Sequence, residues 1–159
     1  MNSKWISSTR AIRIGLGLLI LGLALSDEAP TRAALAGSAS LTVIVENLRN
    51  TEGTLRVAIW DSEDGFADGD QSVAGAALPA SDEELRFVFD NLAPGRYAVA
   101  VYHDENDNGK FDRTLIGLPA EGLGFSNDAW LTVLGAPSFE RAAIELDGTA
   151  ADAVINLRY

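Results

Sequence analysis

The sequence has no cysteine, one histidine and one methionine among its 159 residues. The absence of cysteine rules out disulfides, a thiolate nucleophile and a lipid anchor on an N-terminal cysteine. With His103 as its only histidine and no cysteine, the chain has few of the side chains that usually bind zinc. A Ser-His-Asp triad would have to combine His103 with Ser126, and no nucleophile-elbow motif surrounds that serine. We therefore predict that the protein is not an enzyme, and that His103 packs or forms a hydrogen bond at a strand end.

Basic residues are also scarce, with 12 of them against 23 acidic residues and a net charge of −11. Four of the 12 and two of the 23 lie within residues 1–36, so residues 37–159 keep eight basic and 21 acidic side chains, a net charge of −13. Such a surface repels phosphate backbones and anionic lipids. We therefore expect no nucleic-acid partner and no peripheral membrane role.

Long hydrophobic runs are absent apart from one of twelve residues, IGLGLLILGLAL at 14–25. A helix that spans a bilayer needs about 20 apolar residues, so this run is too short for an anchor. Three basic residues precede it and small residues follow it, which is the pattern of a signal peptide. We predict that residues 1–36 are a signal peptide and short leader, cleaved after Ser26 or Ala36. Residues 37–159 are then an exported domain, periplasmic or extracellular, with no stable membrane insertion after cleavage.

The rest of the chain shows the alternation of apolar and polar residues that is typical of half-buried β-strands. In TLRVAIWD (54–61), for example, Leu55, Val57 and Ile59 alternate with polar or small residues. No window has a sustained helical period with caps at both ends. The chain is therefore expected to be all-β, a single immunoglobulin-like or transthyretin-like β-sandwich of about seven strands. We predict these strands at 41–48, 54–61, 84–92, 96–104, 139–146 and 152–159, with a short one at 129–134.

The segment LAPGRY (92–97) predicts how two of these strands are joined. Pro94 and Gly95 suit a tight turn between them. Tyr97 should bury its ring and donate its hydroxyl to a backbone carbonyl, as in a tyrosine corner.

Residues 92–112 follow the pattern L-x-P-G-x-Y-A-V-A-V-x-H-D-x-N-x-N-G-K-x-D, and GLPAEGLGFSN follows at 117–127. Together these motifs resemble the bacterial domain of unknown function 2141, over residues 40–159. The resemblance implies an exported β-sandwich and implies no activity, because none is established for the family. Two positions depart from the family pattern. Ala120 stands where a basic residue is expected, and Asp128 where a second asparagine is common, so the resemblance does not imply that this loop binds an anion.

The stretch DENDNGKFD (104–112) presents oxygen-bearing groups at alternate residues. Calcium takes six to eight oxygen ligands, and acidic loops supply them with this spacing. Gly109 would allow the sharp turn that closes such a loop. Five ligands fall short of six, so we expect Glu121 to complete the shell. The candidates within the loop are two carboxylates, two amides and one backbone carbonyl, from Asp104, Asp112, Asn106, Asn108 and Lys110.

An ordinary polar turn is the alternative, because Asp, Asn and Gly are also turn residues. An EF-hand is rejected, since Leu115 stands where its bidentate glutamate would be and the flanking segments resemble strands. Two features favour a cation over the plain turn. The alternation runs further than a turn requires, and the carboxylates would repel one another on a chain this negative.

Two further loops are candidates. GLPAEGLGFSND (117–128) holds three glycines and a proline, so we expect a constrained loop with positive φ angles that either faces a ligand or packs with Phe125 in the core. DSEDGFADGD (61–70) is an acidic loop, more typical of a solvated surface. It could lie at the same end as the Asp104 loop if the two preceding strands run in the same direction.

Three classes of function remain open. The leading hypothesis is a non-catalytic module that binds calcium through Asp104–Asp112 and has an unknown protein or small-molecule partner. The second is a small-ligand or glycan-binding module without a metal, for which an exposed aromatic side chain beside a pocket would be the sign. The third is a hydrolase that uses Glu121 and Asp128 as a carboxylate pair. The candidate stacking residues for the second class are Trp60, Tyr102 and Trp130.

Overall fold

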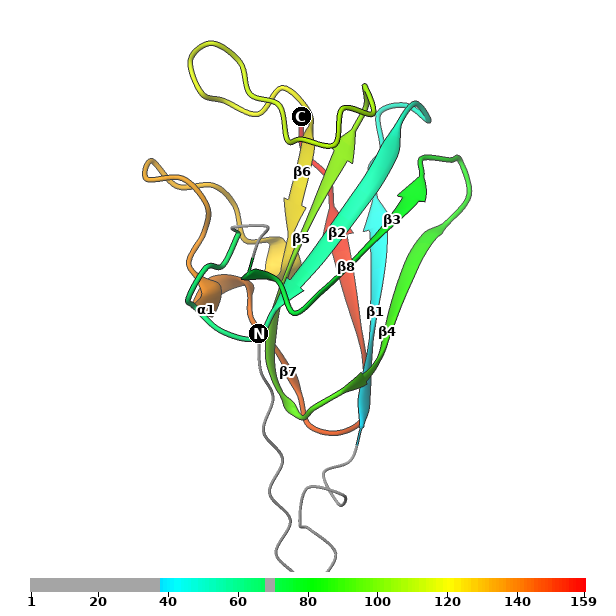
Figure 1. Cartoon of the computed structure of the whole chain (residues 1–159), viewed down its shortest axis with the longest axis vertical. Coiled ribbons are helices and arrows are strands. Elements are labelled where there is room, and N and C mark those ends of the chain that lie inside the picture. Colours follow the sequence, from blue (N-terminus) through cyan, green and yellow to red (C-terminus); the bar gives the residue numbers. More distant parts are fainter. Residues whose placement is uncertain (1–37, 68–70) are drawn as a thin grey trace, which may run out of the picture. The chain divides into compact units, whose positions relative to one another are not determined.

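The computed structural model describes residues 38–67 and 71–159, which belong to a single compact unit. The predicted signal peptide and leader, residues 1–36, lie outside the described residues. The described chain is all-β, as the sequence predicts, with strands β1 to β8 in two facing sheets (Figure 1). In chain order, the strands are β1 (Ala39–Glu46), β2 (Thr54–Trp60), β3 (Ala74–Pro79), β4 (Leu85–Leu92), β5 (Gly95–Asp104), β6 (Gly122–Phe125), β7 (Ile144–Leu146) and β8 (Ala150–Asn156).

The smaller sheet has the order β4-β1-β8, and the larger has the order β3-β2-β5-β6, with β7 paired to β5. β1 and β8 run parallel, whereas the other strand pairs are antiparallel. Among the described residues, no helix is long and apolar enough to cross a membrane.

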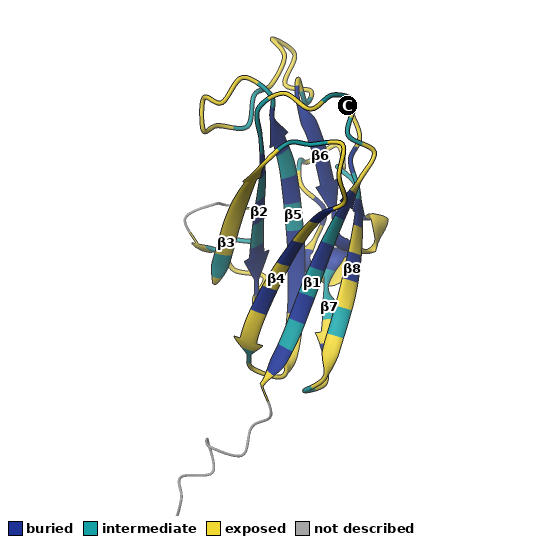
Figure 2. Cartoon of the chain, turned by 90° about the vertical axis from the view of Figure 1, so that its right-hand side faces the viewer, coloured by how far each residue is buried: buried dark blue, intermediate teal, exposed yellow. Residues whose placement is uncertain are grey.

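The main core lies between the two sheets and is made by alternate residues of their strands. Along β1, Leu41 and Val43 are fully buried while Thr42 between them is only partly buried. Figure 2 shows this alternation as stripes along β4, β1 and β8. Each large aliphatic side chain buried in this way stabilises the fold by about 1.5–3 kcal/mol. The period of two therefore determines which face of each strand points inward.

A second apolar cluster covers the outer face of the larger sheet. It contains the outward residues of β2, β5 and β6, together with a one-turn helix α1 (Phe139–Ala142) and residues of the adjoining loops. Phe66 contacts three other rings edge-on, with centroid distances of 5.4 Å to Trp60, 6.2 Å to Phe125 and 5.9 Å to Phe139. The burial of Phe125 that the sequence suggested is thus confirmed.

Several predicted elements are wrong in detail. Residues 129–134 do not form a strand, because Thr132 makes only an isolated bridge to Gly135 and the side chains between them are exposed. Residues 139–146 form α1 followed by β7 rather than one strand. β3 was not predicted, since its sequence AGAALP has little alternation and lies mostly exposed at a sheet edge.

The glycine-rich segment 117–128 also differs from expectation. Gly117 has a positive φ of 82°, but Gly122 and Gly124 lie in strand β6 and not in a loop. Close neighbours explain their presence. A Cβ built on Gly124 would lie 2.6 Å from Cγ2 of Ile155 in β8, and one built on Gly122 would lie 2.5 Å from Cε1 of Tyr159. The glycines therefore allow β6 to approach β8 closely.

Candidate functional site

The candidate calcium loop connects two neighbouring strands, β5 and β6, at one end of the larger sheet. His103 of β5 pairs with Gly122 of β6, so the register places Asp104 and Glu121 opposite each other at the base of the loop. Both carboxylates are buried, at 0% and 3% exposure. The acidic segment that follows β2 is described over residues 61–67 and starts at the opposite end of the sheet, because β2 and β5 are antiparallel. The expectation that the two acidic loops share one end is therefore wrong.

Asp104 is held by three donors. Its Oδ1 accepts the backbone N–H of Asn108 at 3.0 Å, and its Oδ2 accepts that of Gly109 at 2.9 Å and the Nε–H of Arg56 at 2.8 Å. Burial alone would raise the pKa of this carboxyl, but the hydrogen bonds from Arg56, Gly109 and Asn108 outweigh burial and leave the pKa below its ordinary value of 3.8. A carboxylate has about four acceptor sites, so one remains unused.

Glu121 ties both arms of the loop to the sheet. Its Oε1 accepts the backbone N–H of Glu105 at 3.2 Å, and its Oε2 accepts that of Asp112 at 3.0 Å. Glu105 is itself held by Arg49, whose Nε–H donates to Oε1 at 2.7 Å and whose Nη2 forms a second, shorter bond to Oε2. These hydrogen bonds from Arg49 lower the pKa of the Glu105 carboxyl. The base of the loop is thus held by the buried carboxylate of Glu121 and by Glu105, which is paired with Arg49.

Three side chains meet at the centre of the loop. The amide nitrogens of Asn106 and Asn108 both donate to Oδ2 of Asp112, at 2.7 and 2.8 Å. The two amide oxygens accept backbone N–H groups, Asn106 Oδ1 from Asn108 at 3.1 Å and Asn108 Oδ1 from Lys110 at 2.7 Å. The side chains therefore converge on one carboxylate oxygen while they also hold the curved backbone.

Two left-handed residues give the loop its curvature. Gly109 has φ 76°, which glycine adopts without steric cost, and this confirms its predicted place in the sharp turn. Asp107 has φ 55°, which aspartate tolerates better than most residues. The Oδ1 atom of Asp107 accepts the hydroxyl of Thr54 at 2.6 Å, so this bend is attached to the start of β2.

The six predicted ligands thus belong to one loop and its base, but the five side chains among them already accept hydrogen bonds from the protein. Within the described ranges, no group of three or more histidine, cysteine, aspartate or glutamate side chains is arranged to hold a metal. The loop in this structure is a polar turn closed by its own amides. A cation at its centre would have to displace the two amide N–H donors from Asp112.

His103 is fully buried and satisfied, as the sequence predicts. Its Nε2 lies 2.6 Å from the carbonyl oxygen of Glu52, and its Nδ1 lies 2.9 Å from the hydroxyl of Tyr159. A carbonyl can only accept, so Nε2 carries a proton and donates it to Glu52. His103 therefore joins the connection between β1 and β2, the end of β5 and Tyr159.

The groups considered for catalysis lie apart. Glu121 precedes β6 and Asp128 follows it. The four residues of β6 between them span roughly 13 Å. The two carboxyl groups of a glycosidase lie about 5–9.5 Å apart, so these two acids are too far from each other to form such a pair. Ser126 is buried, where its hydroxyl donates to the carbonyl of Ala142 at 2.5 Å and accepts the N–H of Val99 at 2.9 Å. Val99 is four residues before His103 on β5, so this serine and this histidine do not meet.

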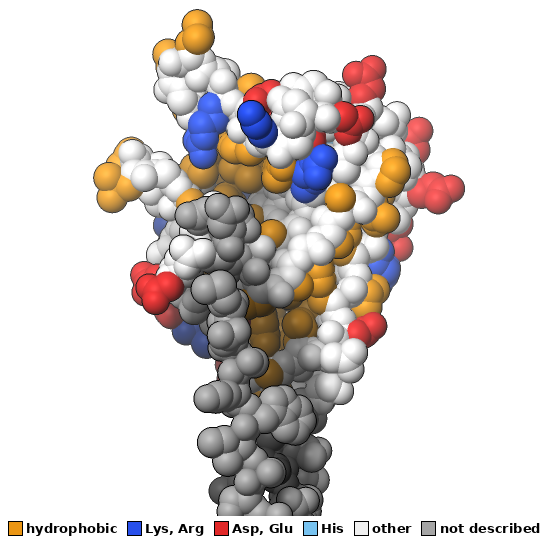
Figure 3. All heavy atoms as spheres, viewed as in Figure 1, with side chains coloured by type: hydrophobic (Ala, Val, Ile, Leu, Met, Phe, Trp, Pro, Cys, Tyr) orange, Lys and Arg blue, Asp and Glu red, His pale blue; other side chains and the backbone are white. Residues whose placement is uncertain are grey.

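A pocket of about 370 Å³ lies on the outer face of the larger sheet, and we call it the outer-face pocket. Its floor includes Ala58 and Ala100, which pair across β2 and β5. Aromatic residues form much of its wall, and three basic side chains also line it: Arg56, Lys110 and Arg113. Figure 3 shows blue side chains next to orange ones on the upper part of this face. Alternation along β2 and β5 could have identified the outward residues, but the loops that complete the pocket gave no such signal.

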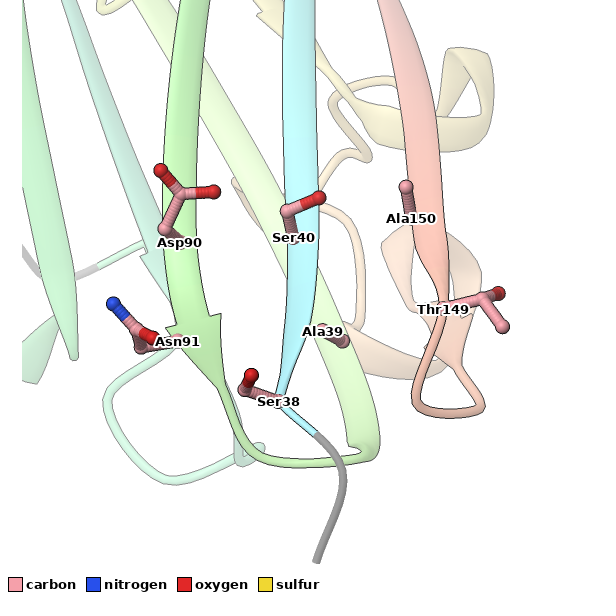
Figure 4. Close-up of a pocket in the computed structure, with 7 residues that line it drawn as sticks. All are labelled: Ser38, Ala39, Ser40, Asp90, Asn91, Thr149 and Ala150. Carbon is pink, nitrogen blue, oxygen red and sulfur yellow. The ribbon is translucent and has the colours of Figure 1, made fainter.

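A second hollow of about 470 Å³ lies at the far end of the smaller sheet, where β1, β4 and β8 meet (Figure 4). Small or polar side chains line it, and Asp90 is the charged one among the seven residues labelled there. It offers neither an apolar wall nor a basic group, so we assign no site to it.

The three candidate stacking residues differ in accessibility. Trp60 is 3% exposed and is covered by Phe66, so it offers no free face. Trp130 is half-buried, with the guanidinium of Arg158 lying 4.9 Å from its ring centroid. Tyr102 is half-buried and lines the outer-face pocket. Only one of the three thus stands partly exposed beside a pocket.

A family model described as "Uncharacterized protein conserved in bacteria (DUF2141)" matches residues 43–153. The chain belongs to this family. The DUF2141 match runs from β1 into β8 and includes the whole Asp104 loop, which confirms the resemblance found in the two motifs. The DUF2141 description states no activity. No curated protein and no solved structure matches the chain.

Proposed function

We propose that the protein is a non-catalytic binding module that takes up one calcium ion in the loop Asp104–Asp112. The observation that carries the proposal is the convergence of Asn106 and Asn108 on one carboxylate oxygen of Asp112. An amide turned end for end presents oxygen where its nitrogen was. The three side chains that now meet through hydrogen bonds could therefore offer three oxygens to a cation.

The remaining ligands come from the base of the loop. Asp104 has one acceptor site left after its three hydrogen bonds. Lys110 can contribute its backbone carbonyl, as the middle position of such loops does. Both oxygens of Glu121 accept one backbone N–H each, so coordination by Glu121 would use their remaining sites.

The distribution of charge supports a cation at this position. Five carboxylates lie within residues 104–121, and two of them are paired with a base, Asp104 with Arg56 and Glu105 with Arg49. Among the described residues, the other three carboxylates form no ion pair. A divalent cation would reduce their mutual repulsion.

The affinity should be modest, because only two of the loop carboxylates, Asp104 and Asp112, are candidate ligands and the loop has no bidentate glutamate. We expect a dissociation constant of about 10⁻⁴ to 10⁻³ M, the range of extracellular calcium modules. At ten times that concentration, binding adds about 1.4 kcal/mol to the free energy of unfolding. A gain of this size raises the melting temperature by a few degrees. Magnesium should do much less, because it requires a tight octahedron and releases water reluctantly.

The test is a thermal melting series of the protein with EDTA, calcium or magnesium. Asp112→Asn removes the carboxylate on which the amides converge, so this variant should lose most of the calcium-dependent shift. Asp107→Asn is the matched control, since it removes the same charge from the same loop but its carboxylate contacts Thr54. Each shift is measured against the same variant in EDTA, which separates calcium binding from any structural effect of the substitution.

Two results would contradict the proposal. If 10 mM calcium does not change the melting temperature of the wild-type protein, the loop is a polar turn and not a calcium site. Equal loss of the shift in Asp112→Asn and Asp107→Asn would show that calcium only screens the charge of the loop.

We further propose that this binding takes place outside the cytoplasm, because residues 1–36 have the features of a signal peptide and leader. An affinity near 10⁻³ M suits compartments in which calcium is abundant. Residues 37–159 would then be the functional domain.

A further inference from the structure

We infer that the outer-face pocket binds a small organic anion with a flat apolar body, independently of calcium. The anionic group would lie at Lys110 and Arg113, and the apolar body would lie over the alanine floor beside Tyr102. This site goes beyond the proposed calcium function, because its contacts are side chains that face away from the sandwich core.

The pocket exists because the sheet has its smallest side chains where the surrounding residues are large. Ala58 and Ala100 pair across β2 and β5 and leave the floor low. Around them stand rings from separate elements, with Tyr102 on β5, Phe111 in the Asp104 loop and Phe125 on β6. Tyr102 and Phe111 support each other edge-on, with centroids 5.8 Å apart. A volume of about 370 Å³ falls within the range of small-molecule sites.

The charge at the pocket is opposite to that of the chain. Residues 38–159 contain eight basic side chains, and three of them line this one pocket, whereas no acidic side chain is among its described lining residues. The positions of these bases differ. Arg56 is paired with Asp104, and the guanidinium of Arg113 lies 5.1 Å from the ring centroid of Phe111 and donates to the carbonyl of Gly117 at 3.1 Å.

This distribution selects the chemistry of the occupant. The net charge of −11 repels anions from the molecule as a whole, so an anion is held only where basic groups are gathered beside a surface poor in water. A neutral sugar would leave the basic groups without a partner, and a purely apolar molecule would not use them. A compact molecule with one apolar face and one acidic group fits both features.

The test uses two fluorescent probes that share one ring system, 8-anilinonaphthalene-1-sulfonate and N-phenyl-1-naphthylamine, which lacks the sulfonate. Both are titrated into the full chain in EDTA, so that the result does not depend on calcium binding. We expect saturable binding of the sulfonate probe at one site per chain, at least fivefold tighter than binding of the neutral probe.

Two sets of variants assign the site. The double variant Lys110→Gln, Arg113→Gln should weaken the sulfonate probe about tenfold and leave the neutral probe within twofold, because two partly exposed charges contribute roughly 1.4 kcal/mol together. Its control is Arg86→Gln, Arg141→Gln, which removes the same charge away from the pocket and should change neither probe. Ala58→Leu fills the floor and should abolish binding of both probes, whereas Ala76→Leu on the exposed edge strand β3 should not.

The inference is overturned by any of three results. These are no saturable binding of the sulfonate probe at millimolar concentration, equal affinity for both probes, or equal weakening by the two charge-removing double variants. If Ala58→Leu does not fold, the charge variants still decide the question, since Lys110 and Arg113 are exposed. Loss of the calcium-dependent melting shift would leave the probe titrations unaffected, so the two proposals fail separately.

Discussion

The hydroxyl of Tyr97 shows how one atom can join two sheets of the sandwich. Tyr97 is 6% exposed, and its hydroxyl donates to the carbonyl of Ala93 at 2.9 Å, in the short connection between β4 and β5. Burial raises the pKa of this phenol. The tyrosine corner predicted from LAPGRY is thus confirmed.

Tyr97→Phe should lower the free energy of unfolding by about 1 kcal/mol, the net contribution of one such hydrogen bond. Urea denaturation of the two proteins measures the difference. Tyr102→Phe is the matched control, because the described residues offer the Tyr102 hydroxyl no hydrogen-bond partner, and it should change stability little. An unchanged midpoint for Tyr97→Phe would mean that water replaces the carbonyl at no cost.

A second residue-scale prediction concerns Asp104 and pH. The pKa of its carboxyl is lower in the folded protein than its ordinary value of 3.8, so its contribution to stability is complete above that value and is lost as the pH falls through the folded pKa. Asp104→Asn lacks this contribution. We expect the variant to be about 2 kcal/mol less stable than wild type at pH 6, since charged hydrogen bonds are lost, with a smaller gap at pH 3.

Denaturation in urea at the two pH values measures the gap, and carboxyls common to both proteins cancel. Arg56→Gln supplies a second check, because removing the Arg56 hydrogen bond should raise the pKa of Asp104 and move the loss of stability to higher pH. A gap of the same size at pH 3 and pH 6 would contradict the assignment of the shift to Asp104.

At the scale of elements, strand β6 depends on the absence of side chains. A Cβ on Gly124 would lie 2.6 Å from Ile155 Cγ2 and 2.8 Å from the backbone oxygen of Asn156, so Gly124→Ala must push β8 away. We expect a loss of about 1–3 kcal/mol, typical of overpacking. Gly95→Ala is the control, since its new Cβ would meet nothing closer than 3.7 Å. Thermal unfolding measures both, and equal small effects would show that β6 does not need close contact with β8.

The elements that sequence reasoning found are those that contribute alternate residues to the core. Leu55, Val57 and Ile59 face inward as their period of two requires, and the same holds for β4 and β5. The sequence does not predict β3, because an exposed edge strand of small residues needs no alternation of apolar and polar side chains. α1 was mistaken for a strand because one turn is too short to establish a period of 3.6 residues.

The Asp104 loop could be located from sequence because its spacing is local. Its partners could not, since Arg56 and Thr54 reach the loop from β2 and Glu121 reaches it from the position just before β6. The outer-face pocket could not be predicted from the sequence at all. The residues that line it come from three strands and three loops, which are brought together only by the pairing of the sheet.

At the scale of the whole molecule, the proposal of export has a direct consequence for the mass of the mature protein. Residues 1–36 carry the signal-peptide features and lie outside the described residues. Expressed in a bacterial host, the protein recovered outside the cytoplasm should lack residues 1–26 or 1–36, which intact mass spectrometry distinguishes. A chain that keeps residue 1 and stays in the cytoplasm would contradict export.

The parallel pairing of the first and last strands determines when the chain can fold. β1 is the central strand of the smaller sheet, with β4 on one side and β8 on the other. Ser40 pairs with Ala150 and Glu46 with Asn156, which is the largest separation in sequence between paired strands in the described part of the chain. Contacts between such distant residues form slowly, because the entropy cost of closing the loop comes before any contact can stabilise the paired strands. A chain still being synthesised therefore has no partner for one edge of β1 until β8 is made, and the smaller sheet is completed only after Ala150–Asn156.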